Sequence, residues 1–249
     1  MMKFLSFLSL FTWLAGSTCA QTDHSAEALR FLRLALPVML FPYADFELAG
    51  QDNIAVGADG SLALGVLDGQ DRVNGGLRAE LSIDFPFLPG ETLSYRWQLL
   101  LPPEFTSDVL QNRWMVAGQW HDQPDRARGE TWDSFTSHSP PLAIRLGGIG
   151  DRVFMAVGYG PTKDGAPQQV SAPRALSRDR WHDIAVTIHW SQGAEGWAIL
   201  KLDGEPFPIM RGANMNNAAP HYLKLGLYHH PDIRGDRWIN LRKVEIGPP

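Results

Sequence analysis

Short runs of β-type residues, separated by turn residues, dominate the chain from residue 43 to its end. Glycine, proline, aspartate and asparagine interrupt these runs, and no long amphipathic helix or repeat of fixed period competes with them. Many short strands joined by turns are typical of an all-β sandwich of two antiparallel sheets. The ten runs cover residues 62–67, 77–83, 92–101, 113–121, 141–147, 152–159, 181–190, 196–204, 222–228 and 238–246.

The sequence predicts a single domain in which these strands share one core. A chain of 249 residues, 44% of them hydrophobic, can bury a large core, and no linker rich in serine, glycine or proline divides it. Residues 26–42 are apolar, but their arginines and Pro37 exclude a membrane-spanning helix, so a short helix or a first strand is expected there. Asp203-Gly204 predicts a tight hairpin turn. The polar segments 121–141 and 160–179 predict long loops, which often line binding sites.

Residues 1–20 have the pattern of a secretory signal peptide. A positive start at Lys3, an apolar stretch over residues 4–15 and small residues up to Ala20 give this pattern. Cleavage after Ala20 leaves residues 21–249 as one secreted domain, extracellular or periplasmic, without a membrane attachment. The only cysteine, Cys19, lies in the segment that is removed. The mature chain is therefore expected to have no disulfide, no cysteine nucleophile and no cysteine zinc site.

Charge and motif content exclude several classes of function. The formal net charge of −5 and the pI near 5.9 argue against binding to nucleic acid or to an anionic membrane. No HExxH, EF-hand, P-loop or GxSxG pattern is present, so zinc-protease, nucleotide-binding and serine-hydrolase interpretations have no support.

Three of the predicted strands combine an apolar face with a face of chemically capable side chains. Strand side chains alternate with a period of two. Each motif taken alone is more often a surface ion pair, a buried hydrogen-bonding pair or an ordinary amphipathic strand. If the three strands adjoin, however, their polar faces form a concave groove. The expected groove side chains are Arg78, Glu80 and Ser82; Arg113, Met115, Ala117, Gln119 and His121; and Tyr222, Lys224, Gly226 and Tyr228, with Trp114, Val116, Gly118 and Trp120 facing the core.

At these residues the sequence resembles the jelly-roll polysaccharide lyases. Alginate lyases of that architecture carry the motifs R-x-E-L, Q-x-H and Y-x-K-x-G-x-Y, which stand here at residues 78–81, 119–121 and 222–228. The intervening sequence looks closer to the glucuronan-lyase and heparin-lyase-like branch, and the likeness covers residues 43–247. Ser82 departs from the alginate pattern, which has a second arginine at that position.

This resemblance implies a β-jelly-roll (concanavalin-like) sandwich with a concave substrate groove. It implies an endo-acting lyase that cleaves a 4-linked polyuronate by β-elimination and leaves unsaturated uronate ends. Its partner is an anionic polysaccharide, with β-1,4-glucuronan favoured; alginate and heparin are alternatives, and a non-catalytic carbohydrate-binding module is a rival. A glycoside hydrolase would need two carboxylates, but only Glu80 lies on the polar face. The chain is expected to act as a monomer and to need no cofactor, although a structural calcium ion fits the same resemblance.

The resemblance also implies roles for the groove side chains. Gln119 and Arg78 neutralise the C6 carboxylate, because the C5 proton is barely acidic while that carboxylate is charged. Tyr228 and His121 supply acid and base, with the division set by stereochemistry. In glucuronate and mannuronate, H5 and O4 lie on one side of the ring, so Tyr228 alone can serve both roles while His121 assists at the carboxylate. In guluronate and iduronate, His121 acts as base opposite Tyr228.

Other side chains have weaker expected roles. Glu80 orients Arg78, Lys224 binds a neighbouring carboxylate, and Tyr222 and Arg113 contact substrate. Four further residues are expected at the groove end or in the long loop, namely His229, His230, Asp133 and His138. His182 and His189 are expected to be structural, on a core strand.

Overall fold

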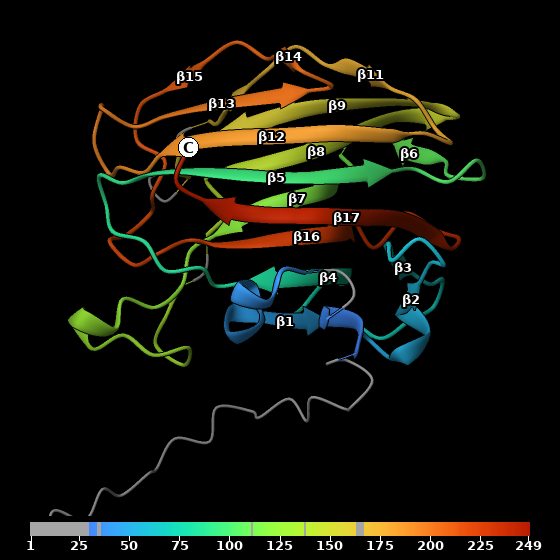
Figure 1. Ribbon diagram of the computed structural model, residues 1–249, viewed down its shortest axis with the longest axis horizontal. Helices are drawn as coiled ribbons and strands as arrows, with labels where there is room; N and C mark the ends of the chain where they lie inside the picture. The colour runs from blue at the N-terminus through green and yellow to red at the C-terminus, as the bar shows by residue number, and fades with distance from the viewer. Residues whose placement is uncertain (1–29, 34–35, 111, 137, 163–166) are drawn as a thin grey trace, which may run out of the picture.

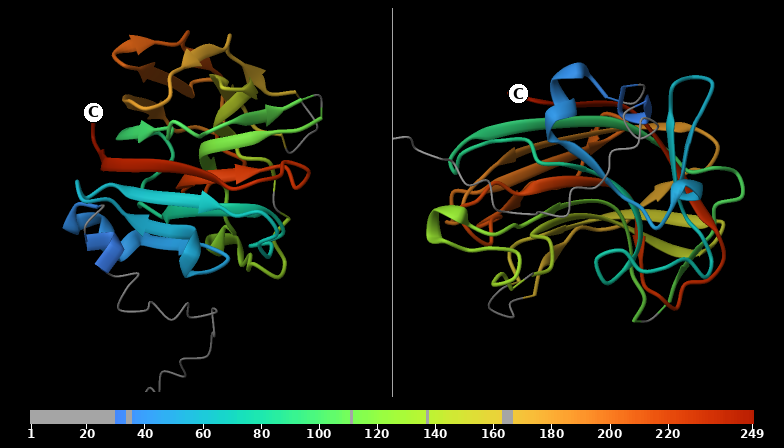
Figure 2. Two further views of the ribbon diagram at one scale, coloured as in Figure 1. Left: turned by 90° about the vertical axis from the view of Figure 1, so that its right-hand side faces the viewer. Right: turned by 90° about the horizontal axis from the view of Figure 1, so that it is seen from below.

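Two antiparallel sheets packed face to face make up the protein (Figures 1 and 2). The computed structural model describes residues 30–33, 36–110, 112–136, 138–162 and 167–249. The expected signal peptide, residues 1–20, lies outside the described residues. Within them, no helix is long and apolar enough to cross a membrane.

The first sheet, called sheet 1 below, has nine strands in the order β1-β4-β16-β7-β8-β9-β10, with β6 on β8 and β11 on β9. Its strands are β1 (Ala44–Glu47), β4 (Leu77–Ile83), β6 (Ser107–Val109), β7 (Met115–His121), β8 (Leu142–Gly150), β9 (Arg152–Tyr159), β10 (Gln169–Val170), β11 (Arg174–Leu176) and β16 (Tyr222–His229).

The second sheet, called sheet 2, has eight strands in the order β14-β13-β12-β5-β17-β3-β2, with β15 on β13. Its strands are β2 (Ile54–Val56), β3 (Leu62–Val66), β5 (Thr92–Leu100), β12 (Trp181–His189), β13 (Trp197–Leu202), β14 (Glu205–Pro206), β15 (Met210–Arg211) and β17 (Arg237–Gly247). Three short 3-10 helices complete the described elements, η1 (Val38–Tyr43), η2 (Gln51–Asn53) and η3 (Arg126–Arg128).

All ten predicted runs contain a strand, and β4 and β9 have the predicted bounds. The predicted Asp203-Gly204 turn is confirmed, because Leu202 pairs with Glu205 across it and both turn residues have positive φ. Residues 30–33 are helical and are followed by η1, in agreement with the expected short helix. The segment 160–179 is not a simple loop, since it contains β10 and β11.

Aromatic side chains fill the space between the sheets. Trp120 of β7 is fully buried, and its ring meets Tyr95 of β5 edge-on at 5.2 Å between centroids. Tyr95 in turn accepts a hydrogen bond from Trp190 at 3.1 Å. The prediction that Trp120 faces the core is confirmed, so the neighbouring positions Gln119 and His121 point to the opposite face of sheet 1.

Candidate active site

The three strands that carry the polar motifs are neighbours in sheet 1. Strand β16 lies between β4 and β7 and is antiparallel to both. Its Lys224 stands opposite Gln119, and its Gly226 stands opposite Glu80. Leu223, Leu225 and Leu227 alternate with these positions and are fully buried in the core. The structure therefore gathers the polar side chains on one face of sheet 1, called the polar face below.

A buried network of charges lies at the centre of the polar face. Glu47 of β1 bridges Lys224 at 2.6 Å and Arg78 at 3.0 Å. Glu80 accepts a hydrogen bond from Gln119 at 2.6 Å and lies 3.3 Å from Arg78. Arg78, Glu80, Gln119 and Lys224 are each at most 6% exposed. Buried charges require such partners, so these residues hold one another in place.

The two carboxylates of this network differ in their pKa. Burial alone would raise the pKa of Glu47, but the charges of Lys224 and Arg78 outweigh it and hold that pKa below its usual range. Burial raises the pKa of Glu80, which is completely enclosed, despite the same two cations. The network thus places two cations, Arg78 and Lys224, on the polar face with fixed carboxylate partners.

Glu47 is a candidate site residue that the sequence did not reveal. It lies on a strand of four residues, and it stands opposite Glu80 in the register between β1 and β4. A strand this short shows no alternation that could mark its polar face. The adjacent β4 motif offers the only signal, because its Arg78 and Lys224 of β16 together need more negative charge than Glu80 supplies.

Tyr228 lies at one end of the polar face and is packed against other rings. The guanidinium of Arg78 sits 4.0 Å from the centre of its ring, and Trp114 meets it edge-on at 4.4 Å. Gly76 lies against the same ring, so closely that any side chain there would overlap it. Tyr228 is thus held as part of an aromatic and cationic stack.

Tyr222, and not Tyr228, is the tyrosine beside His121. Tyr222 stands directly opposite His121, with ring centroids 5.8 Å apart, whereas Tyr228 stands opposite Val116. Six residues separate the two tyrosines along β16, which corresponds to about 20 Å. The register therefore places Tyr222 directly beside His121, and the expected role of Tyr228 as acid or base stays a prediction.

An irregularity in β7 changes which of its side chains face the core. The register shifts between Val116 and Gly118 where β7 pairs with β8. Before the shift, Met115 is fully buried in the core and Trp114 lies on the polar face against Tyr228. Ala117 also belongs to the core. The expected faces of these residues were wrong, because one extra residue in a strand inverts the alternation.

Arg113 lies outside the gathered residues. It precedes β7, which begins at Met115, and it forms an ion pair with Asp108 of β6. The structure therefore does not bring Arg113 into the buried network, and its expected contact with substrate stays a prediction.

His121 is held by its neighbour in the chain. Its Nδ1 lies 2.9 Å from the carbonyl oxygen of Asp122 and 3.0 Å from Oδ1 of the same residue. His138, expected to contact substrate, hydrogen-bonds to the other carboxylate oxygen of Asp122 at 2.8 Å. Burial and the nearby Glu47 and Glu80 raise the pKa of Tyr222, so its phenol keeps its proton.

Four further histidines, His182, His189, His229 and His230, and Asp133 lie away from this pair. His182 contacts Asp203, and His189 contacts Thr92. Both histidines lie on β12 of sheet 2, as expected, and away from the polar face. His229 is buried on the core side opposite Met115, and His230 lies against Trp114. Asp133 is exposed in the long loop.

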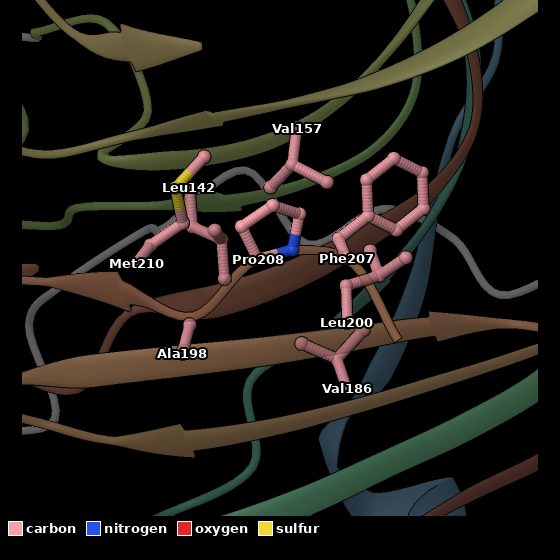
Figure 3. A pocket seen from close by; sticks show the side chains of 8 residues that line it. All are labelled: Leu142, Val157, Val186, Ala198, Leu200, Phe207, Pro208 and Met210. Atoms are coloured by element: carbon pink, nitrogen blue, oxygen red, sulfur yellow. The ribbon is translucent and has the colours of Figure 1, made fainter. Parts of the chain in front are cut away.

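The expected structural calcium ion stays a prediction. Among the described residues, no group of three or more histidine, cysteine, aspartate or glutamate side chains could hold a metal ion. An apolar hollow between the sheets, shown in Figure 3, is also no candidate for acid–base chemistry. It is lined by Leu142, Val157, Val186, Ala198, Leu200, Phe207, Pro208 and Met210.

Comparisons with known proteins agree with this geometry. A family model described as polysaccharide lyase matches residues 46–244, and no curated protein matches the sequence. The endo-β-1,4-glucuronan lyase of the fungus Trichoderma reesei is 15% identical with a TM-score of 0.56, and the match covers 83% of this chain and 87% of that one. The marine alginate lyase of Zobellia galactanivorans is 12% identical with a TM-score of 0.53, covering 80% and 81%. An alginate lyase of Pseudomonas aeruginosa is 13% identical with a TM-score of 0.53, covering 80% and 87%. At these identities the structures show a shared fold, the jelly-roll sandwich.

Proposed function

Because the chain belongs to the polysaccharide lyase family, we propose that it cleaves β-1,4-glucuronan by β-elimination, with His121 and Tyr222 as its acid–base pair. The observation that carries this proposal is the direct opposition of these two rings beside a buried network that holds the cations Arg78 and Lys224. The likeness in fold to a glucuronan lyase, and Ser82 at the position of the alginate-type arginine, support glucuronan over alginate.

The first requirement of the reaction is to neutralise the C6 carboxylate. The side-chain amide of Gln119 donates one N–H to Glu80, and its second N–H can donate to the substrate. Arg78 and Lys224 belong to the same network, and their ion pairs with Glu47 fix their positions. These two side chains therefore need not rearrange when the uronate binds. In this proposal Glu80 and Glu47 position the cations, and the cations make the C5 proton more acidic.

The elimination then proceeds between His121 and Tyr222. The C5–H bond breaks and its proton goes to Nε2 of His121, while the electron pair forms the C4–C5 double bond. The C4–O4 bond breaks, and the departing O4 takes the hydroxyl proton of Tyr222. The raised pKa of Tyr222 keeps that proton available until the leaving group needs it. Proton exchange with solvent restores both side chains.

The placement of the pair also bears on the epimer. His121 and Tyr222 project from adjacent strands on one face of sheet 1, so both reach a bound sugar from the same side. Syn elimination, in which H5 and O4 leave from one side of the ring, is the stereochemistry of glucuronate and mannuronate. This geometry supports those epimers over guluronate and iduronate.

Localisation, oligomeric state and mode of cleavage belong to the same proposal. Residues 1–20 direct export, and the mature chain acts outside the cytoplasm as a monomer. Cleavage is endo-acting and leaves an unsaturated uronate at the new non-reducing end.

A panel of polyuronates tests the proposal. Glucuronan, alginate and heparin are each incubated with the protein, and the ultraviolet absorbance of the unsaturated uronate is followed. We expect the fastest rise with glucuronan and loss of the rise in His121→Ala. A faster rise with alginate or heparin contradicts the substrate. Binding without any rise in absorbance contradicts the elimination and indicates a carbohydrate-binding module.

A further inference from the structure

Asp122 is a buried carboxylate that directly adjoins the proposed acid–base pair. It directly follows β7 and its side chain is completely buried. We propose that Asp122 is a positioning residue that keeps the proton of neutral His121 on Nδ1 and leaves Nε2 free as the base on the polar face. Its effect on turnover rests on the proposed elimination, whereas its effect on the position of the proton does not.

The surroundings of His121 Nδ1 determine where the proton lies. The two oxygens of Asp122 nearest to this atom, at 2.9 Å and 3.0 Å, are both acceptors. Whichever of these two oxygens Nδ1 bonds to, Nδ1 must carry an N–H. A neutral imidazole carries one such N–H, so Nε2 keeps its lone pair. A free lone pair can take the C5 proton, but it cannot donate a hydrogen bond to the C6 carboxylate.

The two carboxylate oxygens of Asp122 differ in their hydrogen-bond partners. Oδ2 accepts hydrogen bonds from Nδ1 of His138 at 2.8 Å and from the side-chain amide of Asn216 at 2.9 Å. Oδ1 is buried, and no donor among the described residues satisfies it with good geometry, although His121 Nδ1 is 3.0 Å away. A buried carboxylate oxygen without a well-placed donor favours a positive charge beside it. It is therefore placed to stabilise His121 once Nε2 has taken a proton.

Other charged groups do not disturb this arrangement. Burial alone would raise the pKa of Asp122, but the hydrogen bonds from His121, His138 and Asn216 outweigh it and lower the pKa. His221 packs nearby, and its Nε2 accepts from the backbone of Asn216 while its Nδ1 donates to a carbonyl. Burial keeps His221 neutral, so it adds no competing positive charge. On the other side, His121 faces the phenol of Tyr222.

The substitution Asp122→Asn tests whether Asp122 positions the proton of His121. The donors from His138 and Asn216 hold an acceptor at the Oδ2 position, so the new amide places its oxygen there. Its NH₂ group then faces Nδ1 of His121 and can donate to it. The backbone carbonyl oxygen of Asp122 still accepts from Nδ1, but the new amide N–H competes with the Nδ1 proton and the negative charge is lost. Part of the neutral imidazole therefore moves its proton to Nε2, and the base loses its lone pair in that fraction. We expect kcat to fall by about a hundredfold or more with little change in KM.

The chain offers a matched control in a second aspartate–histidine pair. Asp203 lies 2.8 Å from Nδ1 of His182 on sheet 2, away from the polar face. Asp203→Asn removes the same charge from a similar hydrogen bond. We expect this variant to keep the wild-type turnover.

Nitrogen NMR of the imidazoles reads the proton position without substrate. For the neutral imidazole, we expect the proton on Nδ1 in the wild type and a clearly larger fraction on Nε2 in Asp122→Asn. A wild-type proton on Nε2 overturns the proposal even if the variant fails to fold. Wild-type turnover in Asp122→Asn, or an equal loss in Asp203→Asn, overturns it as well. If no polyuronate is cleaved but the NMR result holds, the proposed elimination fails while the positioning by Asp122 stands.

Discussion

Tyr222 of β16 and His121 of β7 stand opposite each other, with ring centroids 5.8 Å apart and the buried Lys224–Gln119 pair on the next rung of the same face. This opposition predicts which tyrosine is needed for turnover. Tyr222→Phe removes only the hydroxyl, so we expect kcat to fall by about 10²–10⁴-fold, the usual contribution of a positioned acid or base. The initial rate of absorbance increase measures it.

Tyr228→Phe is the matched control for this prediction, because it removes the same group from the other end of the same strand. Its ring contacts with Arg78 and Trp114 remain. We expect a loss of no more than a few-fold. A larger loss in Tyr228→Phe than in Tyr222→Phe would return the acid to the tyrosine that the sequence motif favoured.

Glu47→Gln should destabilise the fold through the cations it leaves behind. Lys224 is 3% exposed, and it keeps no carboxylate at 2.6 Å once Glu47 is neutral. Removing one partner of a buried ion pair costs about 3–5 kcal/mol in the free energy of unfolding. Urea unfolding at neutral pH measures this loss. Asp59→Asn, which breaks an ion pair in which Asp59 is largely exposed, is the control and should change little.

Acidic pH should remove the contribution of wild-type Glu47 to the free energy of unfolding. Its pKa is lowered in the folded protein, so its stabilising effect is fully present above its ordinary value of 4.5 and is lost as the pH falls through the folded-state value. The difference in unfolding free energy between wild type and Glu47→Gln should therefore shrink in acid. A constant difference across this range would show that Glu47 does not act through its charge.

Much of this site could be predicted from the sequence. The positions that were predicted wrongly have specific structural causes. The motifs on β4, β7 and β16 marked Arg78, Gln119 and Lys224 correctly, because two-residue alternation identifies the polar face of a regular strand. The shift near Val116 and Gly118 in β7 has no such signature, so Trp114 was assigned to the wrong face.

The partner of His121 required the register between strands, which the sequence does not contain. Y-x-K-x-G-x-Y carries two tyrosines on one face, and only the pairing of β16 with β7 distinguishes them. Glu47 and Asp122 were missed for a related reason. Each lies in a short strand or at a strand end, and each acquires its role only from side chains distant in the sequence.

His221 should make the fold sensitive to mild acid. Burial lowers its pKa from 6.5 to about 4. The unfolded chain therefore binds a proton between these values while the folded chain does not, so stability falls as the pH drops from 6.5 to about 4. A shift of this size corresponds to about 3 kcal/mol. His221→Gln should be less stable at neutral pH and should lose less on acidification. Thermal unfolding across this range measures both, and parallel losses in the two proteins would contradict the prediction.

Gly226 allows β4 and β16 to approach each other at the centre of the polar face. It has a positive φ of 150°, and a Cβ there would overlap the backbone carbonyl of Ala79 and the Cα of Glu80. Because backbone cannot rotate away as a side chain can, Gly226→Ala should separate the two strands and displace Glu80. We expect a loss of about 2 kcal/mol or more in unfolding free energy, together with reduced turnover.

Gly118→Ala is the control for this prediction, since Gly118 lies on the adjacent strand and is also buried. Its nearest neighbour to a new Cβ would be the Leu225 side chain at 3.4 Å, an ordinary contact with a movable group. We expect this variant to stay close to wild type in both unfolding free energy and turnover. Equal losses in the two variants would mean that any added methyl group in this sheet is harmful. A loss confined to Gly226→Ala ties the activity to the close approach of β4 and β16, which sets the distance between Glu80 and the cations it helps to hold.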